Sequence, residues 1–229
     1  QLVYSAIRLQ RFEDARVETT GIEIKTLAAA VIAVISVELT MGVINTYYTL
    51  HPLFLTGLAR SMQIILMILI VSSRGEGLSP IGLSLNGFAR GLQKGLLWSA
   101  GFGLATILVT LFFFLGGINL LNFFNTGFPA DPVRIAMLFI VGGFIGPIAE
   151  ELFFRGLLFT YLRRWGMIPA LLGSTAAFVL IHPVQGLAVT QIIGGLLFGV
   201  SFEIEKNLMV PVTIHILGNM AIFTLPAIV

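Results

Sequence analysis

The polar side chains that could do chemistry in this chain are few, and the most suggestive group lies in its second half. Glu150 and Glu151 are adjacent, and Arg155 follows Glu151 by four residues. On a helix Glu151 and Arg155 share one face in the favourable Glu-before-Arg order, whereas Glu150 points about 100° away. This spacing predicts that Glu151 and Arg155 pair and support the helix, leaving the Glu150 carboxylate free. From this motif alone, a purely structural role for both glutamates is as well supported as a free Glu150 carboxylate.

Two of the three histidines also fall in predicted membrane spans. His182 ends one apolar run, and His215 precedes Asn219 by four residues, which places them on one helix face. Glu150 lies 14 residues before position 164, and His182 lies 14 residues after position 168. On antiparallel neighbouring helices these two side chains therefore reach similar depth. Each histidine taken singly is more often structural, but the group as a whole indicates a reactive centre.

The chemistry that uses this whole group is amide hydrolysis without a covalent intermediate. A carboxylate in a low-dielectric pocket is a stronger base than one in water, so Glu150 could take a proton from water. His182 could hold that water and pass a proton to the leaving amine. His215 and Asn219 could donate hydrogen bonds to the developing oxyanion, where one donor is typically worth about 3 to 4 kcal/mol.

These residues resemble the motifs of the CaaX protease and bacteriocin-processing family, also called the Abi family. The motifs, which fall between about 133 and 228, are Glu150-Glu151-x-x-x-Arg155, Phe178-x-x-x-His182 and His215-x-x-x-Asn219. The resemblance implies a glutamic-type intramembrane endopeptidase similar to the type II prenyl-protein CaaX endopeptidases. It also implies that Glu150 and His182 activate water, and that His215 and Asn219 form the oxyanion hole. No cofactor is expected.

Three alternatives remain at this level. A zinc ion could be held by Glu150, His182 and His215, although the chain has no His-Glu-x-x-His motif and Asn219 would then have no role. The polar group could belong to a non-catalytic immunity or scaffold protein. A transporter would also place charges inside spans, but the chain shows no internal repeat of the break at residues 142–147.

Composition predicts the setting of this site. The chain has 229 residues, of which 57% are hydrophobic and 10% charged, against roughly 25% charged in a soluble domain. Its apolar runs are continuous rather than alternating, which favours helices over a transmembrane β-barrel. A net charge of +2 without a basic-aromatic pattern argues against nucleic acid as a partner. Because the chain has no cysteine, disulfides and thiol chemistry are excluded.

We therefore expect an all-α, polytopic transmembrane bundle with an intramembrane polar cavity, in the cell membrane if the host is a prokaryote. About seven spans are predicted, possibly eight, near 26–46, 53–73, 92–116, 133–164, 168–182, 187–203 and 208–228. Residues 1–25 are predicted to lie at the interface, and residues 26–229 to form the membrane domain. The distribution of basic residues places the N-terminus in the cytoplasm.

Two features should break the regular pattern of spans, and one ion pair is expected within them. The fourth span is too long for a simple crossing, so we expect a kink, a tilt or a protrusion around Gly142 to Pro147. The turn after His182 is expected within membrane depth. Glu38 and Arg60, at similar depth in the first two spans, should form a structural ion pair. A role in substrate access, or snorkelling by Arg60, is the alternative.

The expected partners are the lipid bilayer and a membrane-anchored protein or peptide substrate. A prenylated CaaX protein, a leader peptide and a C-terminal sorting tag all fit, and the residues do not choose among them. The side of the membrane from which the site opens is also undetermined.

Overall fold

The computed structural model describes residues 22–75, 77–120, 129, 131–182 and 188–225. These residues are almost entirely helical, and no β-strand occurs among them. The predicted all-α class is therefore confirmed. Most of the predicted interfacial segment (1–21) and the turn after His182 (183–187) lie outside the described residues.

The first two long helices form an antiparallel hairpin. Helix α2 spans Ile24–Tyr47 and α3 spans Pro52–Ser72, close to the predicted 26–46 and 53–73. Pro52 suits the first turn of α3 because its missing N–H needs no partner there, and His51 Nδ1 accepts a hydrogen bond from the Leu53 N–H at 3.3 Å. A 3₁₀ turn, η1 (Ser79–Ile81), leads to the next helix.

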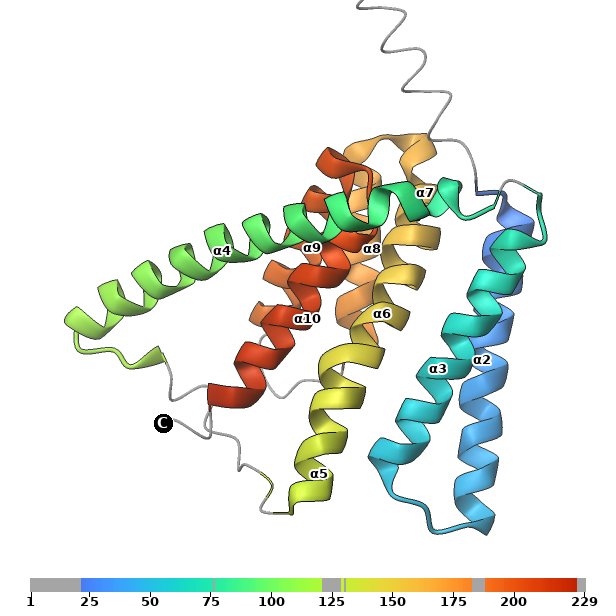
Figure 1. Ribbon diagram of the computed structural model, residues 1–229, viewed down its shortest axis with the longest axis horizontal. Helices are drawn as coiled ribbons and strands as arrows, with labels where there is room; N and C mark the ends of the chain where they lie inside the picture. The colour runs from blue at the N-terminus through green and yellow to red at the C-terminus, as the bar shows by residue number, and fades with distance from the viewer. Residues whose placement is uncertain (1–21, 76, 121–128, 130, 183–187, 226–229) are drawn as a thin grey trace, which may run out of the picture.

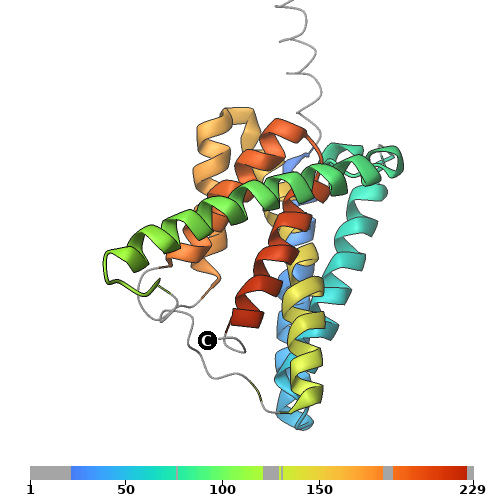
Figure 2. The same cartoon turned by 60° about the vertical axis from the view of Figure 1, so that its left-hand side comes forward.

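Helix α4 spans Leu85–Leu115 and starts seven residues earlier than the predicted 92. Arg90, which precedes the predicted span, therefore lies within the helix. The cap explains the early start, because Ser84 Oγ accepts a hydrogen bond from the Gly87 N–H at 3.0 Å. In Figures 1 and 2, α4 runs obliquely across the other helices, and it packs against α10.

The fourth predicted span is an uninterrupted helical run from Pro132 to Trp165. It consists of α5 (Pro132–Met137), the π-helix η3 (Leu138–Ile145), α6 (Gly146–Glu151), the π-helix η4 (Leu152–Phe159), α7 (Thr160–Leu162) and the 3₁₀ turn η5 (Arg163–Trp165). The break expected around Gly142 to Pro147 takes the form of wider π-helical turns, in which the Gly146 N–H bonds to the Val141 carbonyl. Such turns are frequent at functional sites.

The last three described helices are short. They are α8 (Met167–Leu180), α9 (Val189–Glu205) and α10 (Met209–Thr224), with 14, 17 and 16 residues. A simple crossing needs about 20 apolar residues. Four helices of the described chain are long and apolar enough for one: Ile24–Tyr47, Pro52–Ser72, Ser79–Leu115 and Pro132–Trp165. The count of seven spans therefore stays a prediction.

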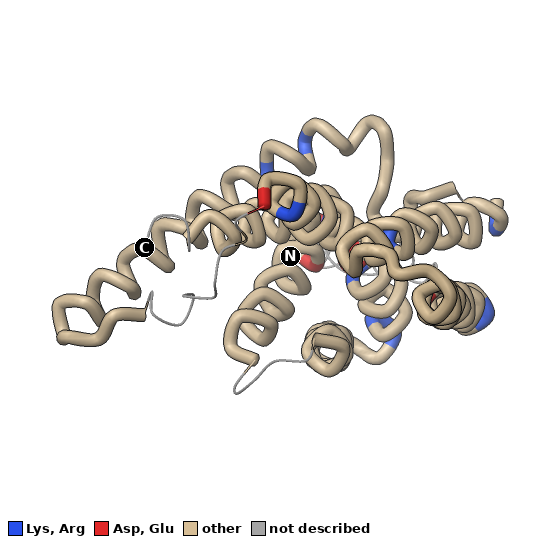
Figure 3. The backbone as a smooth tube through the Cα atoms, turned by 90° about the horizontal axis from the view of Figure 1, so that it is seen from below, with Lys and Arg blue, Asp and Glu red and all other residues tan. Residues whose placement is uncertain are grey.

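Charged positions are few along the chain, as Figure 3 shows. Several basic side chains gather at one end of the bundle, where Arg163 bonds to Glu203, Lys94 pairs with Glu205, and the Arg164 guanidinium donates to the Ile22 carbonyl. These contacts bring together the N-terminal part of α4, the end of the long helical run and the end of α9. The side of the membrane that this end faces stays a prediction.

Candidate active site

The most deeply buried part of the site is an ion pair within the long helical run. Arg155 Nη1 donates to Glu151 Oε1 at 2.9 Å, and both side chains are fully buried. Arg155 Nη2 also donates to the Gly195 carbonyl of α9 at 3.2 Å. The four-residue spacing in the sequence is sufficient to place the first contact, whereas the second depends on how α9 packs.

Glu151 has a second partner that the sequence did not suggest. His215 Nδ1, from α10, lies 2.8 Å from Glu151 Oε1, so one carboxylate oxygen binds both the guanidinium and the imidazole. The role expected for Glu151 was to support the helix through Arg155. It also contacts one of the candidate catalytic side chains, His215.

Glu150 lies between the two imidazoles. Its Oε1 is 3.6 Å from His182 Nε2 of α8, and its Oε2 is 3.7 Å from His215 Nε2 of α10. The Glu150 side chain retains 14% exposure and that of His182 28%. The two neighbouring glutamates thus differ as their positions on the helix suggested, since Glu151 is enclosed and Glu150 can be reached.

The hydrogen bonds of the two histidines fix which ring nitrogens carry protons. His182 Nδ1 lies 2.7 Å from the Phe178 carbonyl, which can only accept, so Nδ1 is the donor. His215 Nδ1 donates to Glu151 in the same way. In their neutral forms both rings therefore turn an unprotonated Nε2 toward Glu150. A water molecule beside the carboxylate could donate to either ring.

Three phenylalanine rings enclose the charged groups. The Arg155 guanidinium lies 4.9 Å from the centre of the Phe178 ring, 5.1 Å from that of Phe198 and 5.9 Å from that of Phe154. The Phe198 ring also stacks on His215 at 4.6 Å and 21°. Sequence reasoning missed Phe198, because an aromatic residue in an apolar helix gives no signal of which side chain it will meet.

Asn219 lies one turn beyond His215 on α10, as expected. Its Nδ2 donates to the Gly142 carbonyl of η3 at 2.8 Å. The amide group has two N–H donors, so one remains for another acceptor. The sequence did not indicate this contact, which joins α10 to the π-helical segment of the long run.

The Glu38 and Arg60 side chains also meet. Arg60 Nη1 lies 3.0 Å from Glu38 Oε1 and donates to Gln63 Oε1 at 2.7 Å, while Gln63 Nε2 donates to Glu38 Oε1 at 2.8 Å. The three side chains form a closed polar group, and Gln63 was not predicted to belong to it. Its position three residues after Arg60 on one helix face was the available signal.

The residues considered for a zinc site are Glu150, His182 and His215. Among the described residues, no group of three or more histidine, aspartate or glutamate side chains has a geometry that would hold a metal ion. The Nε2 atoms of His182 and His215 both face the Glu150 carboxylate.

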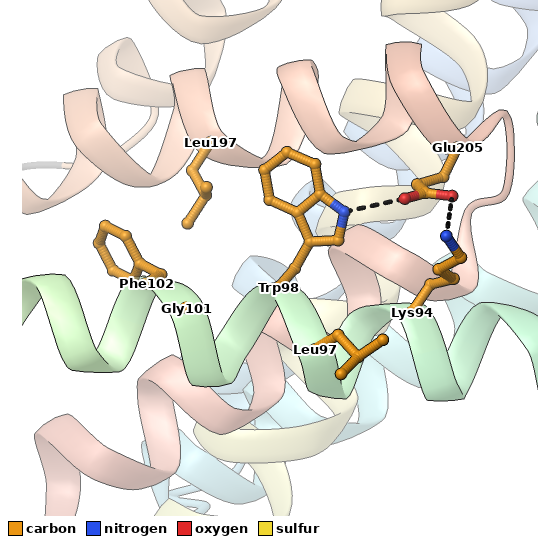
Figure 4. A pocket seen from close by; sticks show the side chains of 7 residues that line it. All are labelled: Lys94, Leu97, Trp98, Gly101, Phe102, Leu197 and Glu205. Atoms are coloured by element: carbon orange, nitrogen blue, oxygen red, sulfur yellow. Dashed lines mark hydrogen bonds and ion pairs between the residues drawn. The ribbon is translucent and has the colours of Figure 1, made fainter.

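A separate hollow of about 470 Å³ opens between α4 and α9. In Figure 4 the Trp98 ring points from α4 toward α9, and its Nε1 donates to Glu205 Oε1 at 3.1 Å. Lys94 Nζ lies 3.6 Å from the other oxygen of Glu205. The residues that line the hollow do not include Glu150 or either histidine near it, and its charged groups pair with one another.

Comparison with known proteins gives one family match. A family model described as "Type II CAAX prenyl endopeptidase Rce1-like" matches residues 132–221, which include Glu150, His182, His215 and Asn219. No curated protein and no solved structure matches the chain. Helices α2, α3 and α4 lie outside the matched residues. The match supports a CAAX-type intramembrane peptidase in general terms, and over residues 132–221 it confirms the resemblance of this chain to the CaaX protease and bacteriocin-processing family.

Proposed function

We propose that this protein is an intramembrane endopeptidase of the glutamic type. It hydrolyses a peptide bond in a membrane-anchored protein, with no covalent intermediate and no metal ion. The observation that carries the proposal is the position of Glu150, whose two oxygens lie 3.6 and 3.7 Å from the Nε2 atoms of His182 and His215.

In the proposed reaction, Glu150 is the general base. It is buried enough to be weakly hydrated but keeps 14% exposure, so that a water molecule and a substrate can reach it. His182 Nε2 is close enough to accept a hydrogen bond from the same water. When Glu150 removes a proton, the water oxygen attacks the carbonyl carbon. Glu150 then passes that proton to His182 Nε2, which lies 3.6 Å away, and the resulting imidazolium gives it to the leaving amine as the C–N bond breaks.

His215 and Asn219 are the proposed oxyanion donors. Because His215 Nδ1 donates to Glu151, its Nε2 can donate only when the ring carries a second proton. The Glu151 carboxylate is placed to balance that positive charge, and Arg155 holds the carboxylate in turn. The second N–H of Asn219 supplies a neutral donor one helical turn away.

The setting favours a substrate that is itself anchored in the membrane. Glu150 lies within a helical run of 34 residues that qualifies as a membrane span. A lipidated C-terminus or a transmembrane tail could reach this depth by moving within the bilayer, whereas a soluble peptide would first have to leave water. The match to a family of prenyl endopeptidases supports the lipidated class.

The test compares Glu150→Gln with the wild type on a farnesylated peptide ending in Cys-Val-Leu-Ser, with both reconstituted in the same vesicles. Gln keeps the shape but cannot take the proton, so kcat/KM should fall about 10²- to 10⁴-fold. Glu23→Gln is the control, because Glu23 is exposed and pairs only loosely with Arg74 at 3.6 Å. Product formation is measured by mass spectrometry. Equal amounts of product from both variants and the wild type would contradict the assignment of Glu150 as the general base.

The same assay separates the two rivals. Under a zinc mechanism, wild-type protein shown by elemental analysis to be metal-free would lose activity, whereas the glutamate mechanism predicts full activity. A non-catalytic immunity or scaffold protein would yield no more product than the Glu150→Gln variant on either a farnesylated or a transmembrane peptide.

A further inference from the structure

Helix α3 brings a positive charge to the site from outside the part of the chain that matches the family. It packs beside η3 and α6, the segments that precede and carry Glu150. The approach is close, because a Cβ atom at Gly57 would lie only 2.8 Å from Val141 Cγ2. Arg60 follows Gly57 by about one helical turn, so it lies next to the part of α3 that approaches η3.

The Arg60 guanidinium is fixed at one end. Nη1 donates to Glu38 and to Gln63, and the Gln63 side chain, 2% exposed, anchors the group to the helix packing. Neither Nε nor Nη2 of Arg60 has a hydrogen-bond partner among the residues that the structure describes. The Arg60 side chain keeps 24% exposure. It is therefore held in one orientation, with two donors still available.

A guanidinium with two available donors suits a carboxylate, which it can bind through two parallel hydrogen bonds. In an apolar environment such a charge interacts strongly with an anion and weakly with neutral groups. The anion that a peptide always carries is its C-terminal carboxylate. An extended residue spans about 3.4 Å, so a chain end three residues beyond the scissile bond lies about 10 Å from the attacked carbonyl.

We propose that Arg60 binds the C-terminal carboxylate of the peptide substrate and thereby selects substrates cut a few residues from their end. This inference rests on the proposed function of the same site and assigns a specificity role to the α2–α3 hairpin. It favours short C-terminal tails over tags in which a transmembrane helix follows the cut.

Two substitutions distinguish this role from a purely structural ion pair. Arg60→Gln removes the charge that would bind the carboxylate, whereas Glu38→Gln leaves that charge and removes only its partner. If the pair were structural, both variants would weaken cleavage of all substrates alike. If Arg60 binds the carboxylate, only Arg60→Gln abolishes the preference for a free C-terminus.

The experiment uses the farnesylated Cys-Val-Leu-Ser peptide with either a free carboxylate or a C-terminal amide. Wild-type protein should cut the carboxylate form with kcat/KM roughly 10- to 100-fold higher, mainly through KM, as expected for a charged hydrogen bond. Glu38→Gln and the control Arg74→Gln should keep this preference. Equal cleavage of both peptides by wild type, or a preference that survives in Arg60→Gln, would overturn the inference.

Binding measured without turnover keeps this outcome separate from the proposed function. The Glu150→Gln protein, with and without Arg60→Gln, is titrated with the two peptides carrying a fluorophore. A carboxylate preference that depends on Arg60 supports the inference even if wild type cuts neither peptide, which would count against the proposed function alone. Equal affinity for both peptides overturns the inference even if cleavage depends on Glu150.

Discussion

The protein contains two Glu–Arg pairs in apolar helices, and their surroundings differ sharply. Glu151 and Arg155 lie on one helical run, are fully buried and are enclosed by aromatic rings. Glu38 and Arg60 lie on two helices, and their side chains are 51% and 24% exposed. The first pair cannot meet a ligand and serves to hold His215. The second can exchange part of its environment for a ligand, which is why only Arg60 suits a binding role.

The largest expected effect comes from breaking the buried pair. Arg155→Met leaves the Glu151 carboxylate without its cation in the protein interior, and such a loss costs about 3 to 5 kcal/mol. We expect a marked fall in the unfolding temperature in detergent micelles and little activity.

The matched control removes both charges. The double variant Glu151→Gln/Arg155→Met should recover a large part of the stability but not the activity, because His215 then lacks its carboxylate. If Arg155→Met alone were as stable as the wild type, the buried Glu151–Arg155 pair would not be what stabilises this region.

The next largest effect tests how closely α3, which carries Arg60, packs against η3. Gly57→Val places a side chain where Val141 already lies, so α3 must move away from η3, at a cost of about 1 to 3 kcal/mol. The preference of the protein for peptides with a free C-terminal carboxylate should fall as α3 moves away. Gly42→Val on α2 is the control, because a Cβ atom there meets nothing within 4 Å. Equal stability of the two variants would contradict close packing of α3.

A smaller effect is expected from the ring that joins the buried pair to His215. Phe198→Leu removes the stacking on His215, which is worth about 1 kcal/mol, and should lower kcat more than it raises KM. Phe202→Leu is the control, since Phe202 is equally buried on the same helix but packs on Phe159 instead. Similar kinetics in the two variants would mean that the stacking does not position His215.

The smallest effect is expected for Glu38→Gln. An ion pair this exposed is worth about 0 to 1 kcal/mol, and Gln can still accept a hydrogen bond from Arg60. The free energy of unfolding, measured in micelles, should therefore stay within about 1 kcal/mol of the wild type. A loss as large as that of Arg155→Met would make the two pairs equivalent and remove the contrast between them.

Much of the fold was predictable because its signals are local. Apolar runs indicated the helices to within a few residues, except for the start of α4, where the Ser84 side chain caps a helix that begins seven residues before the apolar run. The glycines and Pro147 indicated the irregular region of the long run, but not that it would be π-helical. Whether a missing hydrogen bond leads to a kink or to wider turns depends on packing against α3 and α10.

The sequence by itself determined the helical membrane class and the Glu151–Arg155 contact, because residues four apart on a helix must lie on the same face. Only the tertiary structure decided that Glu151 also holds His215, 64 residues away, and that Gln63 completes the polar group around Arg60. Such contacts depend on how each helix is rotated about its axis and how closely it approaches its neighbours. The packing of whole helix faces sets both the rotation and the distance. Neither can be predicted from the spacing of a few polar residues.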